Sequence, residues 1–203
     1  MKNHAFALVL VLLTLVFTAC GSLPGEQRVL RDNSAAEYVT LADGYFSQEK
    51  YAKASEYYEK ALQLTESTNT VTYKLACSYA YEVEYEKAAP LFSELLDKDP
   101  QNRTIKESLA YVTVMSGDVS GGGQLYEELA ADFPEDGKLL KNYVLTLIQS
   151  KNFDEAEEKI KQYKSLFGTD SNSQLLDKKL QEALKPAETS EETSSETTTD
   201  SEE

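Results

Sequence analysis

Cys20, in the sequence FTACGS, has the most distinctive chemical context of any residue in the chain. Its thiol follows the apolar run Ala5 to Ala19, which itself follows the single lysine of MKNH. A membrane-spanning helix needs about 20 apolar residues, and this run is shorter. A short apolar run after a positive charge, ending at a small residue, is typical of a secretory signal peptide, here residues 1–19. The pattern predicts an exported protein whose Cys20 thiol lies at the cleavage point.

This junction resembles a bacterial lipobox, in which the cysteine thiol receives a diacylglycerol and the cysteine becomes the new N-terminus. Phe17 stands where leucine is usual, so the match is to the looser variants. The resemblance implies a lipid (palmitate) anchor at Cys20, where each buried methylene contributes about 0.8 kcal/mol to membrane binding. The alternative is a plain secretory signal with an incidental cysteine. Gly21 and Ser22 lack the aspartate that retains some lipoproteins at an inner membrane, so an outer membrane is expected if the cell has two.

Charge and composition exclude several classes of function. The chain has 20 Lys plus Arg against 35 Asp plus Glu, a net charge of −15. Nucleic-acid binding needs a basic surface, and anionic headgroups repel an acidic protein, so the lipid must provide the anchoring. His4, the single histidine, is removed with the signal peptide, which excludes an imidazole base, a histidine zinc ligand and a serine-histidine triad. We therefore expect no enzyme activity, no metal or other cofactor, and no nucleic-acid partner.

Three further motifs have simple structural explanations. Cys77 lies on an apolar stripe and no histidine can activate it, which favours a small buried residue over a nucleophile. The run SGGGQ at 120–124 lacks the lysine and serine of a phosphate loop. The acidic clusters YEVEYEK and FDEAEEK occupy polar helical positions, whereas a calcium site wraps its oxygens in a loop. Binding through a surface is therefore the expected activity.

The two ends of the mature chain differ in composition from its centre. Residues 186–203, PAETSEETSSETTTDSEE, contain seven acids, no base and no large apolar residue, which predicts a disordered tail. Residues 20–34 are predicted to be the lipidated cysteine and a flexible tether. The folded part is expected over residues 35–185.

The central part of the chain repeats at an interval of 34 residues. Four units fit without an insertion, and their ranges are 35–68, 69–102, 103–136 and 137–170. A fixed period of this length indicates a solenoid. Four columns recur, namely Leu41, Leu75 and Leu109; Ala42, Ala76 and Ala110; Tyr58, Phe92, Tyr126 and Ile160; and Ala54, Ala88, Gly122 and Ala156.

These columns resemble the tetratricopeptide repeat over residues 35–170, most closely in the first two units. The GGG run and the pair Tyr143-Val144 are departures in the last two. The resemblance implies an all-α fold, a right-handed α-solenoid of four helix pairs. Apolar periodicity independently predicts two antiparallel helices per unit, separated by polar turns such as SQEK.

Two local signals predict how this array begins and ends. Ser34 with Glu37 forms a predicted capping box for the first helix. Residues 171–185 are predicted to be a helix that caps the last repeat, because four leucines lie on one stripe. These leucines are Leu175, Leu176, Leu180 and Leu184.

A second apolar stripe runs along the first helix of each unit, beside the core stripe. A helix with one buried face would not need it. The resemblance implies that this stripe lines a concave groove where peptides or helices of partner proteins dock. The alternative is internal packing between adjacent first helices. The predicted groove residues are Val39, Phe46, Tyr73, Cys77, Tyr81, Tyr111, Val114, Met115, Leu145 and Ile148.

Chaperone-binding members of this family use lysines and asparagines in the groove to clamp a C-terminal carboxylate. Only Lys138 and Lys141 are basic at the corresponding places. A carboxylate clamp is therefore not expected, and an apolar or aromatic ligand segment is favoured. The other places carry Val39, Asp43, Tyr73, Cys77 and Glu107.

Two functional hypotheses follow from these observations. The leading one is a membrane-tethered, extracytoplasmic scaffold in the bacterial cell envelope that binds another envelope protein or a peptide segment. The second is a binding protein for a small hydrophobic ligand, coupled to a transporter. Self-association through the exposed stripe is a further alternative, so the oligomeric state stays open.

Overall fold

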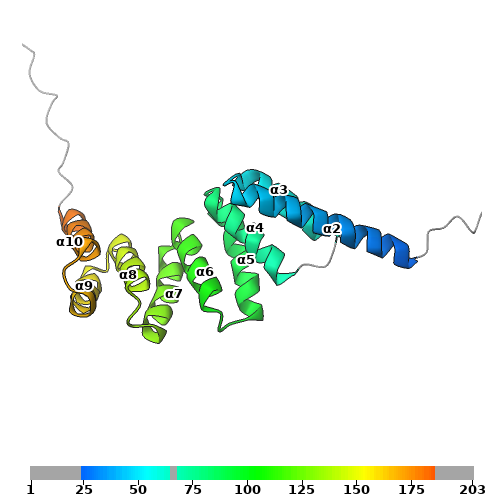
Figure 1. Ribbon diagram of the computed structural model, residues 1–203. Coiled ribbons are helices and arrows are strands. Elements are labelled where there is room, and N and C mark those ends of the chain that lie inside the picture. Colours follow the sequence, from blue (N-terminus) through cyan, green and yellow to red (C-terminus); the bar gives the residue numbers. More distant parts are fainter. Residues whose placement is uncertain (1–23, 65–67, 186–203) are drawn as a thin grey trace, which may run out of the picture. The chain divides into compact units, whose positions relative to one another are not determined.

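The computed structural model describes residues 24–64 and 68–185, with side chains from Arg28 onward (Figure 1). Every regular element in these ranges is an α-helix, so the all-α prediction is confirmed. The signal peptide, Cys20, residues 65–67 and the acidic tail 186–203 lie outside the described residues. The chain divides into two compact units, the first ending at Asp118 and the second beginning at Val119.

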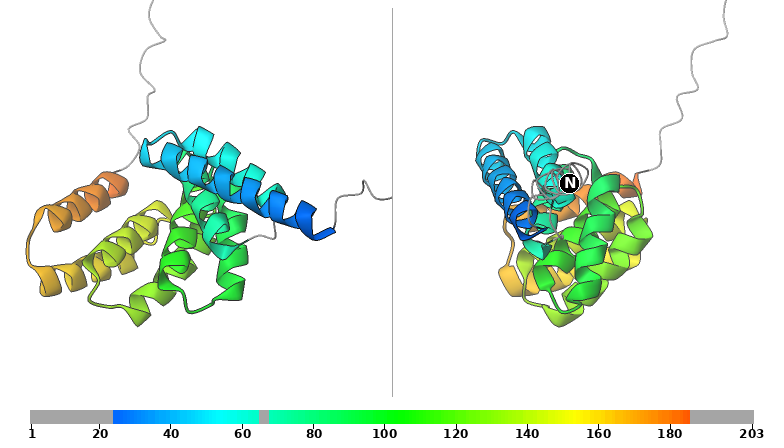
Figure 2. Two further views of the ribbon diagram at one scale, coloured as in Figure 1. Left: turned by 45° about the vertical axis from the view of Figure 1, so that its right-hand side comes forward. Right: turned by 90° about the vertical axis from the view of Figure 1, so that its right-hand side faces the viewer.

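The first unit is built from helices that pack in chain order, each on the next. Three-residue turns join α2 to α3 and α4 to α5, so the helices of each pair run antiparallel, as Figure 2 shows for α2 and α3. Helix pairs of this kind are what the apolar periodicity predicted. The helices are α2 (Pro24–Ser47), α3 (Tyr51–Leu64), α4 (Asn69–Tyr81), α5 (Tyr85–Lys98) and α6 (Arg103–Met115).

Small and aromatic columns form the core of the first unit. The alanines of the predicted small columns are fully buried, which lets neighbouring helix backbones approach closely. Tyr58 and Phe92 are also buried, and each fills the space beside such a contact. Aromatic side chains bury 150–250 Å² each, so these rings contribute much of the stability of the unit. The buried alanines are Ala42, Ala54, Ala76 and Ala88.

The second unit continues both columns. Gly122 and Ala156 occupy the small positions, and Tyr126 and Ile160 occupy the large ones, all buried. Helix α7 packs on α8, α8 packs on α9, and α10 packs on both α8 and α9, as predicted for a final covering helix. The helices are α7 (Val119–Asp132), α8 (Gly137–Gln149), α9 (Phe153–Phe167) and α10 (Ser171–Leu184).

The stripe of α10 differs in part from the predicted one. Leu176 and Leu180 are buried, but Leu175 and Leu184 are exposed. Leu175 lies one position from Leu176, about 100° around the helix, and so faces away from the core. Leu184 is the last residue of the helix.

Four helices are capped at their N-termini by polar side chains that stand 34 residues apart in the sequence. The Thr68 hydroxyl, the Asn102 amide oxygen and the Asp136 carboxylate each accept the backbone N–H three residues on, at 3.0 to 3.3 Å. Asp170 does the same at 2.8 Å, and Ser173 completes its capping box. Each of these bonds satisfies a helix N–H that has no partner within the helix.

Ser34 has the same register, yet α2 continues straight through it. The helix begins at Pro24, so the expected capping box of Ser34 and Glu37 is wrong, and residues 24–34 of the expected tether are helical. Proline suits the first position of a helix, and no glycine or proline interrupts the sequence between Gly25 and Gly44.

Leu41 is another difference from the expected pattern. It is 48 % exposed, whereas its repeat partner Leu75 is 5 % exposed. Helix α3 packs against α4 and precedes it in the stack, but no helix precedes α2 in the described part of the chain. The same leucine position is therefore a core position in one repeat and a surface position in the other.

The turns inside the repeats also share one geometry. Glu49, Val83, Gly117 and Lys151 stand 34 residues apart, and each has a left-handed backbone, with φ of 58°, 66°, 103° and 62°. The N–H groups of Lys50 and Glu84 reach back to the carbonyls of Tyr45 and Tyr79, at 3.0 and 2.9 Å. This pattern is the Schellman motif, which satisfies the last carbonyls of a helix.

A polar contact joins the first three helices of the first unit. The Tyr58 hydroxyl donates to an Asp43 oxygen at 2.5 Å, and the Lys74 amine lies 2.7 Å from the same carboxylate. Burial alone would raise the pKa of Asp43, but the hydrogen bonds from Lys74 and Tyr58 outweigh it and lower the pKa below its usual value. Burial and the bond to Asp43 raise the pKa of Tyr58.

This contact predicts a specific sensitivity to acid. Because the Asp43 pKa is lower in the folded state, its stabilising effect is present above the unfolded pKa of about 3.9 and is lost as the pH falls through the lower folded value. We expect Asp43→Asn to make the melting temperature fall less between about pH 5 and about pH 2. Calorimetry across this range tests it, with the exposed Asp97→Asn as control. Identical acid profiles for Asp43→Asn and the unaltered chain would contradict the assignment.

Candidate functional site: an aromatic surface on the first unit

Seven predicted groove residues are at least partly accessible within the first unit. Tyr81, Tyr111 and Met115 are exposed, at 61 %, 45 % and 46 %. Val114 is only 7 % exposed and offers little surface to a partner. The remaining four residues are half-buried and contact the core, so they combine packing with partial exposure; they are Val39, Phe46, Tyr73 and Cys77.

Three rings from three helices form an aromatic cluster, which we define as Phe46, Tyr51 and Tyr81. The rings of Tyr51 and Tyr81 stack, with centroids 4.6 Å apart and planes inclined by 16°. Phe46 meets Tyr51 and Tyr81 edge to face, at 5.3 and 5.8 Å between centroids. Contacts of this geometry hold the rings in place. The exposed Tyr81 is therefore a fixed surface feature.

A second ring contact lies in the same unit. Tyr85, the first residue of α5, meets Tyr111 of α6 edge to face, with 6.1 Å between centroids. A hydrogen bond with Tyr85, together with burial, raises the pKa of Tyr111. Tyr111 therefore stays neutral at physiological pH, and its hydroxyl can exchange hydrogen bonds with a ligand.

Tyr73 and Cys77, both on α4, are half-buried and pack against the core of the first unit. Tyr73 meets the buried Phe92 edge to face at 5.7 Å and hydrogen-bonds Cys77 through its hydroxyl. Burial raises the pKa of the Cys77 thiol, although the hydrogen bond from Tyr73 opposes this. A thiol with a raised pKa is a weak nucleophile, so these two residues contribute shape and hydrogen bonding to the surface.

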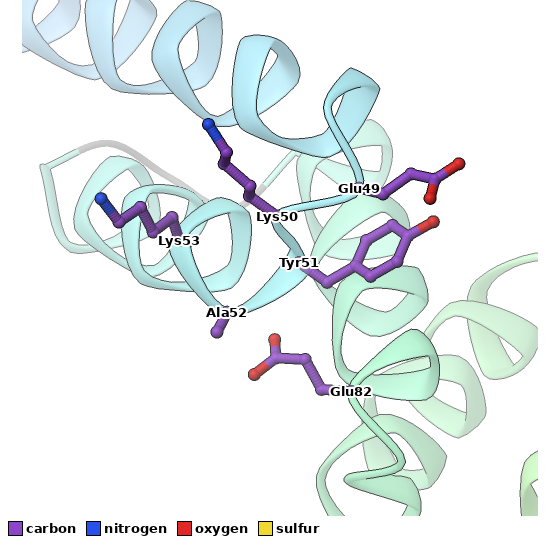
Figure 3. A pocket seen from close by; sticks show the side chains of 6 residues that line it. All are labelled: Glu49, Lys50, Tyr51, Ala52, Lys53 and Glu82. Atoms are coloured by element: carbon purple, nitrogen blue, oxygen red, sulfur yellow. The ribbon is translucent and has the colours of Figure 1, made fainter.

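A pocket of about 410 Å³ opens beside the aromatic cluster. It lies where the turn between α2 and α3 faces the end of α4, and Figure 3 shows the side chains around it. The Glu82 carboxylate accepts a hydrogen bond from the Ser55 hydroxyl at 2.6 Å, which fixes one side of the opening. The lining residues are Glu49, Lys50, Tyr51, Ala52, Lys53 and Glu82.

Leu145 and Ile148, the remaining predicted groove residues, belong to helix α8 of the second unit. Both are half-buried. Their neighbours Val144 and Leu147 are buried in the core of that unit. The second unit therefore presents these two side chains beside a well-packed helix face.

Comparison with known proteins identifies the repeats. A family described as "Tetratricopeptide repeat" matches residues 35–67 and residues 73–136. These two stretches of the chain match the tetratricopeptide repeat. A solved tetratricopeptide repeat protein from Parabacteroides merdae ATCC 43184 has the same fold, with a TM-score of 0.64 and 18 % identity over 74 % of this chain and 60 % of that one.

Two further relatives are informative. The structure of YrrB, described as a TPR protein with an unusual peptide-binding site, gives a TM-score of 0.65 at 15 % identity, covering 71 % of this chain and 75 % of that one. An uncharacterized lipoprotein of Treponema pallidum (strain Nichols) is 24 % identical over 155 residues, covering 75 % of this chain and 79 % of the relative. The solved structures establish the fold of the tetratricopeptide repeats here.

Within the described residues, no group of three or more histidine, cysteine or acidic side chains is arranged to hold a metal ion. None of the helices in that part of the chain combines the length and the apolar composition required to cross a membrane.

Two residues of the aromatic surface, Tyr51 and Tyr85, were not predicted from the sequence. Tyr51 and Tyr85 each begin the second helix of a tetratricopeptide repeat, 34 residues apart, and both contact predicted groove residues. Their matching register was a usable signal, but the apolar stripe that predicted the groove runs only along the first helices. Glu49 and Val83 carried no signal, because neither residue type favours the left-handed backbone that the turns impose.

Proposed function

We propose that this protein is a membrane-tethered, extracytoplasmic scaffold of the bacterial cell envelope. Its first unit holds a segment of another envelope protein on the aromatic cluster and the neighbouring residues of the predicted groove. Leu145 and Ile148, on the second unit, are also proposed to contact a partner. In this proposal the protein is a binding module and not an enzyme.

The observation that carries the proposal is the exposure of ordered tyrosines on the first unit. Tyr81 and Tyr111 are 61 % and 45 % exposed, yet each is held by contacts with another ring. Aromatic residues provide large contact area at low entropic cost, and tyrosine adds a polar tip. YrrB, a protein of the same fold with a peptide-binding site, supports a similar use of the repeats here.

The membrane tether rests on the N-terminal sequence. FTACGS supplies the lipid attachment residue, Cys20, and the Treponema pallidum relative carries the name lipoprotein. The proposed anchor is an acyl modification of Cys20 on the extracytoplasmic face, at the outer membrane in cells that have two. Mass spectrometry of the membrane-extracted N-terminal peptide, compared with a Cys20→Ala variant, tests this part separately.

The small-ligand alternative receives less support from the geometry. A site for an apolar molecule encloses most of its surface, whereas the pocket beside Tyr51 is open to solvent. Partner binding is therefore the function that the surface favours.

Crosslinking in intact cells followed by membrane solubilisation tests the proposal. We expect one dominant envelope protein to co-purify with the full chain. We expect its recovery to fall at least about fivefold with Tyr81→Ala plus Tyr111→Ala, because exposed aromatic residues commonly dominate binding energy. Circular dichroism establishes first that the variant is folded.

Leu166→Ala plus Leu175→Ala provides the matched control, since both leucines are exposed apolar residues on the second unit. Unchanged recovery with the tyrosine variant would overturn the proposed surface. If no partner is recovered from any variant, the scaffold proposal fails, and a thermal-shift screen with extracted lipids then examines the small-ligand alternative.

A further inference from the structure

Helix α2 is longer than α3, the helix on which it packs. It has 24 residues and α3 has 14, and a three-residue turn joins the two in antiparallel order. Counted back from that turn, α3 lies beside α2 only as far as about Ser34. Residues 24–33, which we define as the α2 extension, therefore reach about 15 Å beyond α3. The left view of Figure 2 shows this dark blue end of α2 projecting past α3.

The side chains of the α2 extension are exposed on all sides. From Arg28 to Asn33 each one is exposed, and Ala35, at 3 % exposure, is the first buried side chain described in α2. Successive helical residues are about 100° apart, so these residues surround the helix. Val29 and Leu30 are 58 % and 60 % exposed. A short helix without tertiary packing is marginal in water, so the extension lacks the stabilising contact that the rest of α2 has.

The proposed lipid anchor brings a bilayer to this part of the molecule. Cys20 precedes Pro24, the first residue of α2, by four positions. Four residues span at most about 14 Å even when fully extended. An acylated Cys20 therefore keeps the beginning of α2 within about that distance of the lipid headgroups.

The α2 extension has side chains that suit a phospholipid surface. Arg28 and Arg31 flank Val29 and Leu30, and they are two of only three arginines in a chain with a net charge of −15. Guanidinium groups form paired hydrogen bonds with phosphates. Apolar side chains that accompany basic ones are buried at the boundary between headgroups and acyl chains.

We propose that residues 28–31 contact the headgroup layer of the membrane that carries the lipid, with Val29 and Leu30 at the acyl boundary and both arginines on phosphates. The inference rests on the lipid anchor of the proposed function and adds a second membrane contact to it. Helix α2 continues without interruption into the core of the first unit, where Ala42 is fully buried. The contact therefore restricts the orientation of that unit on the membrane, which a flexible tether would not do.

The charges of the α2 extension specify how it binds. Glu26 and Asp32 give the extension as many acids as arginines. Short-range phosphate contacts and apolar burial therefore provide the binding, and anionic lipid is not required. A second copy of this chain is a poorer occupant, because two chains of net charge −15 repel each other at long range.

Tryptophan fluorescence of the full lipidated chain in vesicles tests the inference, because the chain contains no tryptophan of its own. The vesicles contain phosphatidylethanolamine and phosphatidylcholine with acyl chains brominated near the headgroup. Leu30→Trp places the probe in the proposed contact. Leu41→Trp is the matched control, since Leu41 is exposed on the same side of α2, about 16 Å further along the helix. We expect the brominated lipid to quench Leu30→Trp at least about threefold more than Leu41→Trp.

Arg28→Gln plus Arg31→Gln, made in the Leu30→Trp chain, removes the phosphate contacts. We expect at least about twofold less quenching by the brominated lipid. Lys50→Gln plus Lys53→Gln is the control, because it makes the same change in net charge at exposed positions near the start of α3.

Four results would overturn the inference. They are an unquenched Leu30→Trp, equal quenching of the two tryptophans, equal effects of the arginine and lysine variants, and shielding of Leu30→Trp from acrylamide without quenching by lipid. The last result would identify a protein surface, from a second copy or another protein, as the occupant of the α2 extension.

Mass spectrometry of Cys20 in the same preparation separates this inference from the anchor itself. If Cys20 is acylated and Leu30→Trp is not quenched, the inference is wrong and the anchor stands. An unmodified Cys20 would refute both. The scaffold surface is tested apart from them, because its crosslinking experiment depends on Tyr81 and Tyr111.

Discussion

Replacing Phe92 with alanine is expected to lower the free energy of unfolding by about 3 to 5 kcal/mol. Phe92 is 1 % exposed, belongs to the core of the first unit, and meets Tyr73 edge to face. The substitution removes the transfer free energy of a whole ring and leaves a cavity between packed helices. Helices α4 and α5 cannot close this space fully, because fully buried alanines already fix the closeness of their backbones.

Urea denaturation followed by circular dichroism measures this loss. Phe92→Leu keeps most of the volume and should cost about 1.5 kcal/mol or less. Leu166→Ala, at an exposed position of the second unit, should change stability by no more than about 0.5 kcal/mol. A loss below about 1.5 kcal/mol for Phe92→Ala would show that the Phe92 ring contributes little to the stability of the first unit.

The second large effect is expected at the left-handed turns. Gly117→Val should lower the free energy of unfolding by about 1 to 2 kcal/mol, because a β-branched residue strains a backbone with φ of 103°. A Cβ at Gly117 would meet no atom within 4 Å, so backbone strain alone accounts for the loss. Gly117→Asn should cost less, since asparagine tolerates this conformation.

Val83 provides the reciprocal test at the equivalent position of another repeat. Val83→Gly relieves the strain at φ of 66°, and we expect a gain of about 0.5 to 1 kcal/mol, since greater freedom of glycine in the unfolded chain offsets part of the benefit. Thermal and urea unfolding of both variants provide the measurement. If Gly117→Val and Val83→Gly shift the free energy of unfolding in the same direction, the backbone strain assigned to these turns is wrong.

The repeat period determined most of the fold from sequence alone. Columns such as Ala54, Ala88 and Ala156 recur because helices that cross closely need a small residue at each contact. Tyr58, Phe92, Tyr126 and Ile160 recur because the space beside each contact must be filled. Both requirements are local to one repeat and its neighbour, so a single chain displays them several times.

The beginning of the helical array could not be predicted in the same way. Ser34 has the register of the helix-starting residues Thr68, Asn102, Asp136 and Asp170, but α2 passes through it. A capping side chain stabilises a helix start by about 1 kcal/mol, whereas a continuous helix satisfies the same N–H groups with backbone carbonyls. Sequence pattern alone does not decide between two solutions of such similar free energy.

The sequence by itself determined the period, the helix pairs, the small and aromatic core columns, and the apolar stripe that includes Tyr81 and Tyr111. Only the tertiary structure decided which equivalent residues are accessible. Leu41 and Leu75 share one register but differ in exposure, because a helix precedes α4 and none described precedes α2. The aromatic cluster likewise depends on three helices meeting, since Phe46, Tyr51 and Tyr81 come from α2, α3 and α4. Phe46 and Tyr81 are far apart in the sequence, and only this packing brings their rings into contact.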